Sequence, residues 1–137
     1  MDRAEALARL ASAPSGHLAT IRPDGGPHVV VVTHALADGR VVTAIDHKPK
    51  RSQRLQRLAN IEANPVVSFL VDRYDDDWGA LWWVRVDGVA SIHSGGDAWE
   101  SAVAALTDKY PQYQERAPRG PVIVVTPERV SWWESSG

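Results

Sequence analysis

The segment "DHKPKRSQRLQRL", residues 46–58, has the residue types and spacing best suited to hold an anion. Five of the ten residues from Lys48 to Arg57 are basic and none is acidic, in a chain whose net charge is −2. Ser52 is a favoured N-cap residue type, and the leucines that follow it keep helical spacing as far as the Asn-Pro pair at 64–65. The segment therefore predicts a loop that enters a helix capped by Ser52.

The predicted helix start gives a physical reason to expect a bound anion. Backbone N–H groups in a first helical turn attract anions, and cations beside them are unfavourable unless an anion is present. Arg51 offers a planar fork for bidentate contacts, whereas Lys48 and Lys50 act as mobile point charges. Arg54 and Arg57 lie one and two turns further along the helix. The alternative, a solvated basic helix face, stays open from the residues alone.

Other residue patterns do not complete a metal or nucleophile site. The acids of "DDDW", 75–78, are consecutive and point in different directions, which favours a solvated loop. The chain has no cysteine, no His-Glu-x-x-His pattern and no serine within Gly-x-Ser-x-Gly. We therefore expect no metal and no catalytic side chain, and any chemistry would belong to a bound cofactor. His34 and Arg85 are the side chains to test as proton donors.

Two apolar strand patterns bear on packing. In "WWVRVDG", 82–88, alternation places Trp82, Val84 and Val86 on one face, opposite an indole and a guanidinium that suit a flat anionic ligand or a subunit interface. "HVVVVT", 28–33, has no alternation, which predicts burial on both faces and favours a second subunit covering one of them.

Composition indicates one globular domain over residues 1–137. The chain is 44% apolar and 23% charged, and it has no repeats and no linker. A net charge of −2 argues against general nucleic-acid binding. No apolar run is long enough to span a membrane and no signal peptide is recognised, so we expect a cytoplasmic protein.

The predicted elements combine short strands with inserted helices. Helices are expected within 2–16, from Ser52 to 64, and over 96–110, and Gly88 is expected at a β-bulge. The first three strands are expected to pair consecutively, and the acidic loop 72–80 is expected to balance the basic segment if the two meet. The pattern predicts an α+β barrel, with strands at 17–21, 28–36, 40–45, 66–71, 81–92, 121–125 and 129–133.

Three blocks together resemble a known group of proteins. They are "GHLATIRPDGGPHVVVV", "ADGRVVTAIDHKPKRSQRLQRLANIEANPVVSFLVD" and "WWVRVDGVASI". In this order they resemble the pyridoxamine 5′-phosphate oxidase-like split β-barrel superfamily, and within it the F420-dependent oxidoreductases called flavin/deazaflavin oxidoreductases of group B. The resemblance implies a mainly antiparallel split β-barrel of six to seven strands with flanking helices. It also implies a homodimer with cofactor sites at the subunit interface.

The resemblance further implies which residues would hold the cofactor, coenzyme F420 or alternatively FMN. The phosphate would be held by cations of the loop, the ring would lie along the second and third strands, and tryptophans would supply an aromatic wall. These positions are Lys48, Lys50, Arg51, Ser52 and Arg54 for the phosphate; Val30, Val31, Val32, Thr33, Thr43, Ala44 and Ile45 for the ring; and Trp78, Trp82 or Trp83 for the wall. Which loop cation contacts the phosphate stays open.

The function implied is hydride transfer between F420 and a small unsaturated or quinone-like substrate. Two alternatives remain from the same fold: an FMN-dependent reductase or oxidase, and a non-catalytic module that binds flavin or F420.

Overall fold

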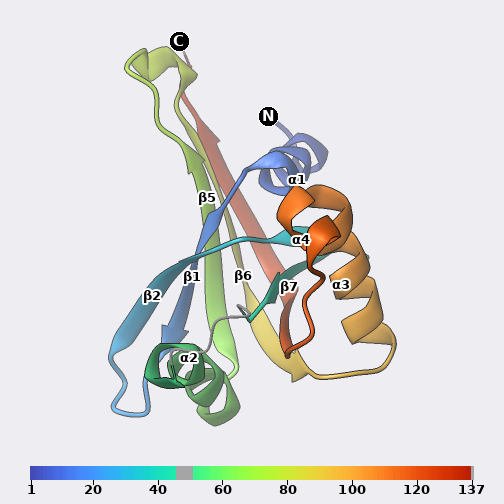
Figure 1. Ribbon diagram of the computed structural model, residues 1–137. Helices are drawn as coiled ribbons and strands as arrows, with labels where there is room; N and C mark the ends of the chain where they lie inside the picture. The colour runs from blue at the N-terminus through green and yellow to red at the C-terminus, as the bar shows by residue number, and fades with distance from the viewer. Residues whose placement is uncertain (46–50, 137) are drawn as a thin grey trace.

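The computed structural model describes residues 1–45 and 51–136, except for the side chains of residues 51–55. None of the helices in these ranges is long and apolar enough to cross a membrane. The elements, shown in Figure 1, follow the chain in the order α1 Arg3–Ser12, β1 Gly16–Ile21, β2 Pro27–Val32, β3 Ala35–Ala37, β4 Arg40–Ala44, α2 Arg51–Ala63, β5 Val66–Arg73, the 3₁₀ turn η1 Trp78–Ala80, β6 Trp82–His93, α3 Asp97–Lys109, α4 Pro111–Glu115 and β7 Val122–Glu134.

The strands form one antiparallel sheet in the order β2-β1-β5-β6-β7-β4-β3. Its two edge strands, β2 and β3, are consecutive in the chain and are joined by Thr33 and His34 alone. Because so short a link must connect opposite edges, the sheet has to curl into a barrel that stays open between them. The predicted α+β split β-barrel is confirmed.

Two strand predictions are wrong in detail. Residues 28–36 are not one strand, since the chain leaves β2 after Val32 and starts β3 at Ala35. The expected pairing of the first three strands is confirmed through the two parts of that segment, because β1 pairs with β2 and β3 pairs with β4. Residues 121–125 and 129–133 belong to the single strand β7, which carries one extra residue, Glu128, opposite the step from Asp87 to Gly88 in β6.

The link between β2 and β3 is held by the end of the third helix and the segment after it. Lys109 Nζ donates to His34 O at 2.8 Å, and the His34 backbone N–H donates to the Tyr110 hydroxyl at 3.1 Å. The hydroxyls of Thr33 and Tyr113 lie 2.9 Å apart. These partners follow the link by about 75 to 80 residues. A sharp crossing in an apolar run is therefore stabilised by contacts from the distant α3 and α4.

Two apolar layers hold the fold together. Within β7, Ile123 and Val125 face the barrel interior, whereas Val122 and Val124 face α3. The first four residues of this strand are buried on both faces, which explains their unbroken apolar sequence. The largest interior side chain, Phe69, is fully buried, and burial of such a side chain contributes about 2–3 kcal/mol.

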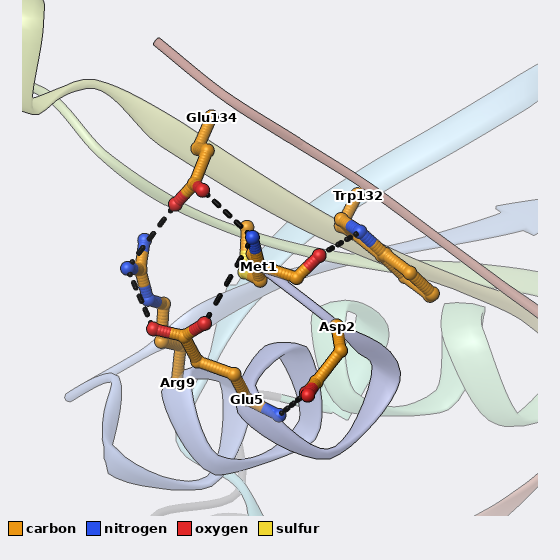
Figure 2. A network of polar contacts seen from close by, with 6 residues as sticks. All are labelled: Met1, Asp2, Glu5, Arg9, Trp132 and Glu134. Atoms are coloured by element: carbon orange, nitrogen blue, oxygen red, sulfur yellow. Dashed lines mark hydrogen bonds and ion pairs between the residues drawn. The ribbon is translucent and has the colours of Figure 1, made fainter. Parts of the chain in front are cut away.

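The first helix is tied to the end of the last strand by an ionic network (Figure 2). The α-ammonium of Met1 donates to Glu134 at 2.8 Å and lies 3.9 Å from Glu5. The Arg9 guanidinium bridges the same two carboxylates, at 3.1 Å from Glu5 and 3.3 Å from Glu134. The Trp132 indole N–H donates to Met1 O at 3.1 Å. These contacts fix α1 across one end of the barrel.

Candidate functional site

The basic segment leads into helix α2 at one end of the barrel. The helix begins at Arg51, so Ser52 lies within its first turn, and the prediction that Ser52 is the N-cap is wrong. The first turn contains no acidic residue. Lys48 and Lys50 lie outside the described residues, as do the side chains of Arg51, Ser52 and Arg54. On the helix, positions 51, 54 and 57 share one face because they are three residues apart.

A buried asparagine fixes α2 against the barrel. Asn60 is fully buried, its Nδ2 donates to the Thr20 hydroxyl at 3.0 Å, and its Oδ1 accepts from Gln56 Nε2 at 2.7 Å. Leu58 and Ile61 flank it and pack into the barrel core. Sequence reasoning missed Asn60, because its hydrogen-bond partner Thr20 lies 40 residues away in the chain.

Two arginines act on a histidine at the barrel end beneath α2. His28 on β2 pairs with Thr20 on β1, which places it beside the buried asparagine contact. Burial lowers the pKa of His28, and the positive charges of Arg22 and Arg57 lower it further. Two guanidinium groups therefore act on this end of the barrel from different elements, the β1–β2 turn and α2.

The strand positions predicted to face a cofactor ring do not form one surface. On β2, Val30 and Val32 pack toward the barrel core, whereas Val31 points outward and is 66% exposed. Beyond the strand, Thr33 is bonded to the Tyr113 hydroxyl. Since β2 lies at one edge of the sheet and β4 next to the opposite edge, the two segments approach only across the split of the barrel.

The predicted positions near β4 are all buried. Thr43 and Ile45 alternate with Ala44, which packs toward α3, whereas Ile45 belongs to the barrel core. The Thr43 hydroxyl is buried and has no hydrogen-bond partner among the described residues. Its oxygen is thus a polar atom inside the barrel. Thr43 lies two residues before Ile45, where the first described range ends.

The outer face of the sheet carries Trp83. Arg85 lies over its ring at 5.5 Å and donates to Asp87 at 3.1 Å, and Asp87 also accepts from the Ser68 hydroxyl. The predicted separation of the two faces of "WWVRVDG" is confirmed, because Val84 and Val86 are fully buried on the inner face. The outer face also exposes large apolar side chains, namely Val29, Val31, Val66 and Trp133.

Trp78 lies far from α2. It belongs to the 3₁₀ turn at the tip of the β5–β6 hairpin, which extends away from the barrel at the end opposite α2 (Figure 1). The acidic loop 72–80 therefore does not meet the basic segment within one chain. The expected charge balance between them is wrong for a single chain.

His34 is a structural residue. It is fully buried, its Nε2 lies 2.7 Å from Leu10 O, and its ring contacts Phe69 at a centroid distance of 4.8 Å. A side chain enclosed in this way has no access to a substrate. Among the described residues, no group of three or more His, Asp or Glu side chains is arranged to hold a metal ion.

Known proteins share this architecture. The solved structure of conserved hypothetical protein Rv2991 from Mycobacterium tuberculosis matches with a TM-score of 0.79 and 26% identity, over 98% of this chain and 85% of that one. A heme binding protein from Mycobacterium smegmatis matches with a TM-score of 0.77 and 27% identity. The match covers 97% of this chain and 54% of the heme binding protein. An FAD-binding protein from Mesorhizobium loti matches with a TM-score of 0.74 and 22% identity, over 99% of this chain and 96% of that one.

The comparison with curated proteins found no match. The family model described as pyridoxamine 5′-phosphate oxidase matches residues 3–134, which is nearly the whole chain. The chain therefore belongs to the pyridoxamine 5′-phosphate oxidase family.

Proposed function

We propose that this protein is an oxidoreductase that uses a phosphate-bearing flavin-type cofactor, F420 in preference to FMN, with a small unsaturated or quinone-like substrate. The observation that supports this proposal most directly is the start of α2. The helix begins at Arg51, within a run of cations and with no acidic residue in its first turn. Such a start repels its own cations unless an anion neutralises them, and a phosphate group satisfies both the N–H groups and the charges.

The residues around this helix start fit a flat cofactor with a phosphate tail. Edge strand β2 pairs only with β1 in the described sheet, so its other side can offer backbone N–H and C=O groups to the polar rim of a ring. The buried Thr43 hydroxyl, two residues before the basic loop, lacks a hydrogen-bond partner among the described residues. Outer-face aromatics such as Trp83 suit a flat conjugated system.

The cation count favours F420 over FMN. FMN carries one phosphate, whereas F420 carries a phosphate and an acidic oligoglutamate tail. Arg54 and Arg57 extend the positive face of α2 beyond its first turn, whereas Arg22 in the neighbouring β1–β2 turn is accompanied by Asp24. FMN is the second candidate, supported by fold relatives that are named FAD-binding proteins.

When bound, the cofactor would supply the hydride chemistry, and this chain would bind, orient and shield it. The backbone of β2 and the start of α2 would fix the two ends of the cofactor. His34 takes no part in proton transfer, because its ring is enclosed between Leu10 and Phe69. Positioning is therefore the protein's contribution to the reaction.

The proposal includes a homodimer. Val29, Val31, Val66 and Trp133 are between 45% and 66% exposed on the outer face of the sheet. An exposed apolar surface of this kind on a sheet is typical of a protein interface. A second copy that covers it would also give the apolar run 28–33 its second buried face.

Titration of the purified protein with F420, and separately with FMN, tests the proposal through tryptophan quenching and cofactor fluorescence. We expect micromolar binding of F420 and weaker binding of FMN. Arg51→Ala should weaken F420 binding at least 10-fold, since a charge-assisted contact is worth about 1.5–3 kcal/mol.

Arg119→Ala is the matched control, because Arg119 is exposed on the loop after α4. It should bind F420 as the wild type does. Tighter binding of FMN would transfer the proposal to the second candidate. Binding of neither cofactor, or equal affinities of Arg51→Ala and the wild type, would reject the anchor.

A further inference from the structure

A groove of about 540 Å³ runs along helix α3. Helix α3 forms one wall, and Gln114 of α4 belongs to the other. The segment after α4 turns back along α3 toward β7 (Figure 1), and Gly120 O of that segment accepts from the Trp99 indole N–H at 2.9 Å. Small-molecule sites usually have volumes of about 300–1,000 Å³. The groove therefore has the size of a ligand site, and its lining includes no described residue of α2.

The floor of the groove is apolar and fixed in shape. Trp99 and Val103 lie one helical turn apart, and both also pack against the apolar layer between α3 and the sheet. The hydrogen bond from the Trp99 indole to Gly120 O holds the ring in place. Ala104 continues the floor on the exposed side of the helix. A ligand with an apolar body can bury it on this preformed surface at little cost in ordering the protein.

The charged side chains of the groove are both acidic. Glu100 and Asp108 line it from positions eight residues apart on α3, which separates them by about 12 Å along the helix axis. Neither carboxylate forms an ion pair in the described part of the chain. No described lysine or arginine lines the groove. Charge complementarity therefore favours a cationic ligand over a neutral or an anionic one.

The position of Asp108 gives a second reason to expect a cation. It lies in the last turn of α3, where a carboxylate is unfavourable because the free carbonyl groups carry partial negative charge. Lys109, the basic residue of this turn, is engaged elsewhere, since its Nζ donates to Ala13 O at 2.7 Å and to His34 O at 2.8 Å. A bound cation would be attracted by both the Asp108 carboxylate and the helix end.

We propose that this groove binds a small primary ammonium ion with an apolar body. The ammonium group lies between Asp108 and Gln114, where carboxylate and amide oxygens accept its hydrogen bonds. The body lies on Val103 and Trp99. Walls from two helices, and the Trp99–Gly120 bond at one end, suit a small molecule rather than a helix of a partner protein. The inference goes beyond the proposed oxidoreductase function and does not rest on it.

Tryptophan indole N–H resonances locate the ligand without any cofactor. The chain has six tryptophans, and of these Trp99 is the one that lines the groove. The ¹⁵N-labelled protein is titrated with hexylammonium chloride, and Trp99→Phe identifies the Trp99 resonance by its loss. We expect a saturable shift of this resonance, with the others unchanged. Trp78 and Trp133 are exposed and report any general binding of the alkyl chain to apolar surface.

A matched pair of probes and a matched pair of variants test the role of charge. Hexanoate has as many carbon atoms as hexylammonium and the opposite charge, and it should bind at least 10-fold more weakly at Trp99. Asp108→Asn should weaken hexylammonium binding about 3-fold, the effect of losing one exposed ion pair. Glu115→Gln removes the same charge from an exposed position on α4 outside the groove lining, and it should bind as the wild type does.

Ala104→Lys tests the groove itself. The substitution places a long cationic side chain on the floor, at an exposed position where the fold can accept it. We expect hexylammonium to cause no shift of the Trp99 resonance in this variant, while its circular dichroism matches that of the wild type. Wild-type binding of hexylammonium by Ala104→Lys would overturn the assignment of the ligand to this groove.

Three further results would overturn the inference. A shift of the Trp78 or Trp133 resonance as large as that of Trp99 would show general apolar binding. Equal affinities for hexanoate and hexylammonium, or wild-type affinity in Asp108→Asn, would reject the ammonium contact. A Trp99 resonance that does not respond to hexylammonium, but responds to protein concentration or to a basic peptide, would assign the groove to a second copy or to a protein partner. A protein that binds neither F420 nor FMN would refute the proposed function and leave this test unaffected.

Discussion

At Gly88 the absence of a side chain allows two long strands to stay paired around an irregularity. The register between β6 and β7 shifts between Asp87 and Gly88. A Cβ atom at Gly88 would lie 2.1 Å from the Thr126 carbonyl oxygen and 3.2 Å from Pro127 Cα, which are both backbone atoms. The irregularity that the sequence predicted at Gly88 is therefore confirmed, although the extra residue, Glu128, lies in β7, and Gly88 permits the close approach of the two backbones.

Gly88→Ala should destabilise the protein by about 1–3 kcal/mol, the usual cost of forcing atoms into a packed site. Urea unfolding followed by tryptophan fluorescence measures this loss. Gly95→Ala is the control, because a Cβ at Gly95 meets no atom within 4 Å. Equal free energies of unfolding for the two variants would contradict the steric argument.

Residues whose roles depend on neighbours in the chain were predictable, and those whose roles depend on distant partners were not. Alternation alone placed Val84 and Val86 inside the barrel, as the structure confirms. The hydrogen bond between Asn60 and Thr20 joins residues 40 apart, so no local pattern indicated it. The same limit applied to His34, whose partners come from α1 and from the end of α3.

At the scale of elements, the crossing between β2 and β3 was the main feature that sequence could not predict. Its residues continue an apolar run with high strand propensity, and a strand over 28–36 was the natural expectation. The break occurs because Lys109 of α3, Tyr113 of α4 and Tyr110 between the two helices are partners for its polar groups. Tertiary contacts here override a local preference.

The buried histidine in this crossing predicts a pH dependence of stability. Burial lowers the pKa of His34 to about 4, helped by the charge of Lys109 and opposed by the hydrogen bond to Leu10 O. The unfolded chain therefore takes up a proton near pH 6.5, whereas the folded chain resists it until about pH 4. Stability should fall by up to about 3 kcal/mol as the pH drops through this window, and should be unaffected by this group above it.

His34→Gln removes the titration and keeps an amide that can donate to Leu10 O. We expect this variant to be less stable at pH 7 but to lose less stability between pH 6.5 and 4.5 than the wild type. Urea unfolding at several pH values gives the free energy of unfolding of each protein as a function of pH. Both proteins contain the same carboxylates, so the contribution of these groups cancels in the difference between the two profiles. Parallel profiles would show that His34 is not the titrating group.

For the molecule as a whole, the arrangement of the sheet explains why one face remains apolar and exposed. The interior is filled by residues that alternate with the outer ones, and α3 covers only the part of the sheet formed by β3, β4 and β7. The outer face of β2, β1, β5 and β6 has no covering helix among the described elements. The sequence predicted that residues 28–33 are buried on both faces, one of them by a second subunit; in the single chain Val29 and Val31 are exposed, and the second subunit stays a prediction.

Replacing the outward valines with lysine tests whether a second copy covers this face. Val29 and Val31 are 60% and 66% exposed on edge strand β2, and lysine at such positions is well tolerated in a monomer but opposes association. Val29→Lys/Val31→Lys should convert a dimer into a monomer in light scattering coupled to size exclusion, with little change in circular dichroism. Ala104→Lys, on the exposed side of α3, should remain dimeric.

The same variants test whether the cofactor site needs both copies. If it does, the monomeric variant should also lose F420 binding, while Ala104→Lys keeps it. A monomer that binds F420 with wild-type affinity would show that the cofactor site does not depend on the interface.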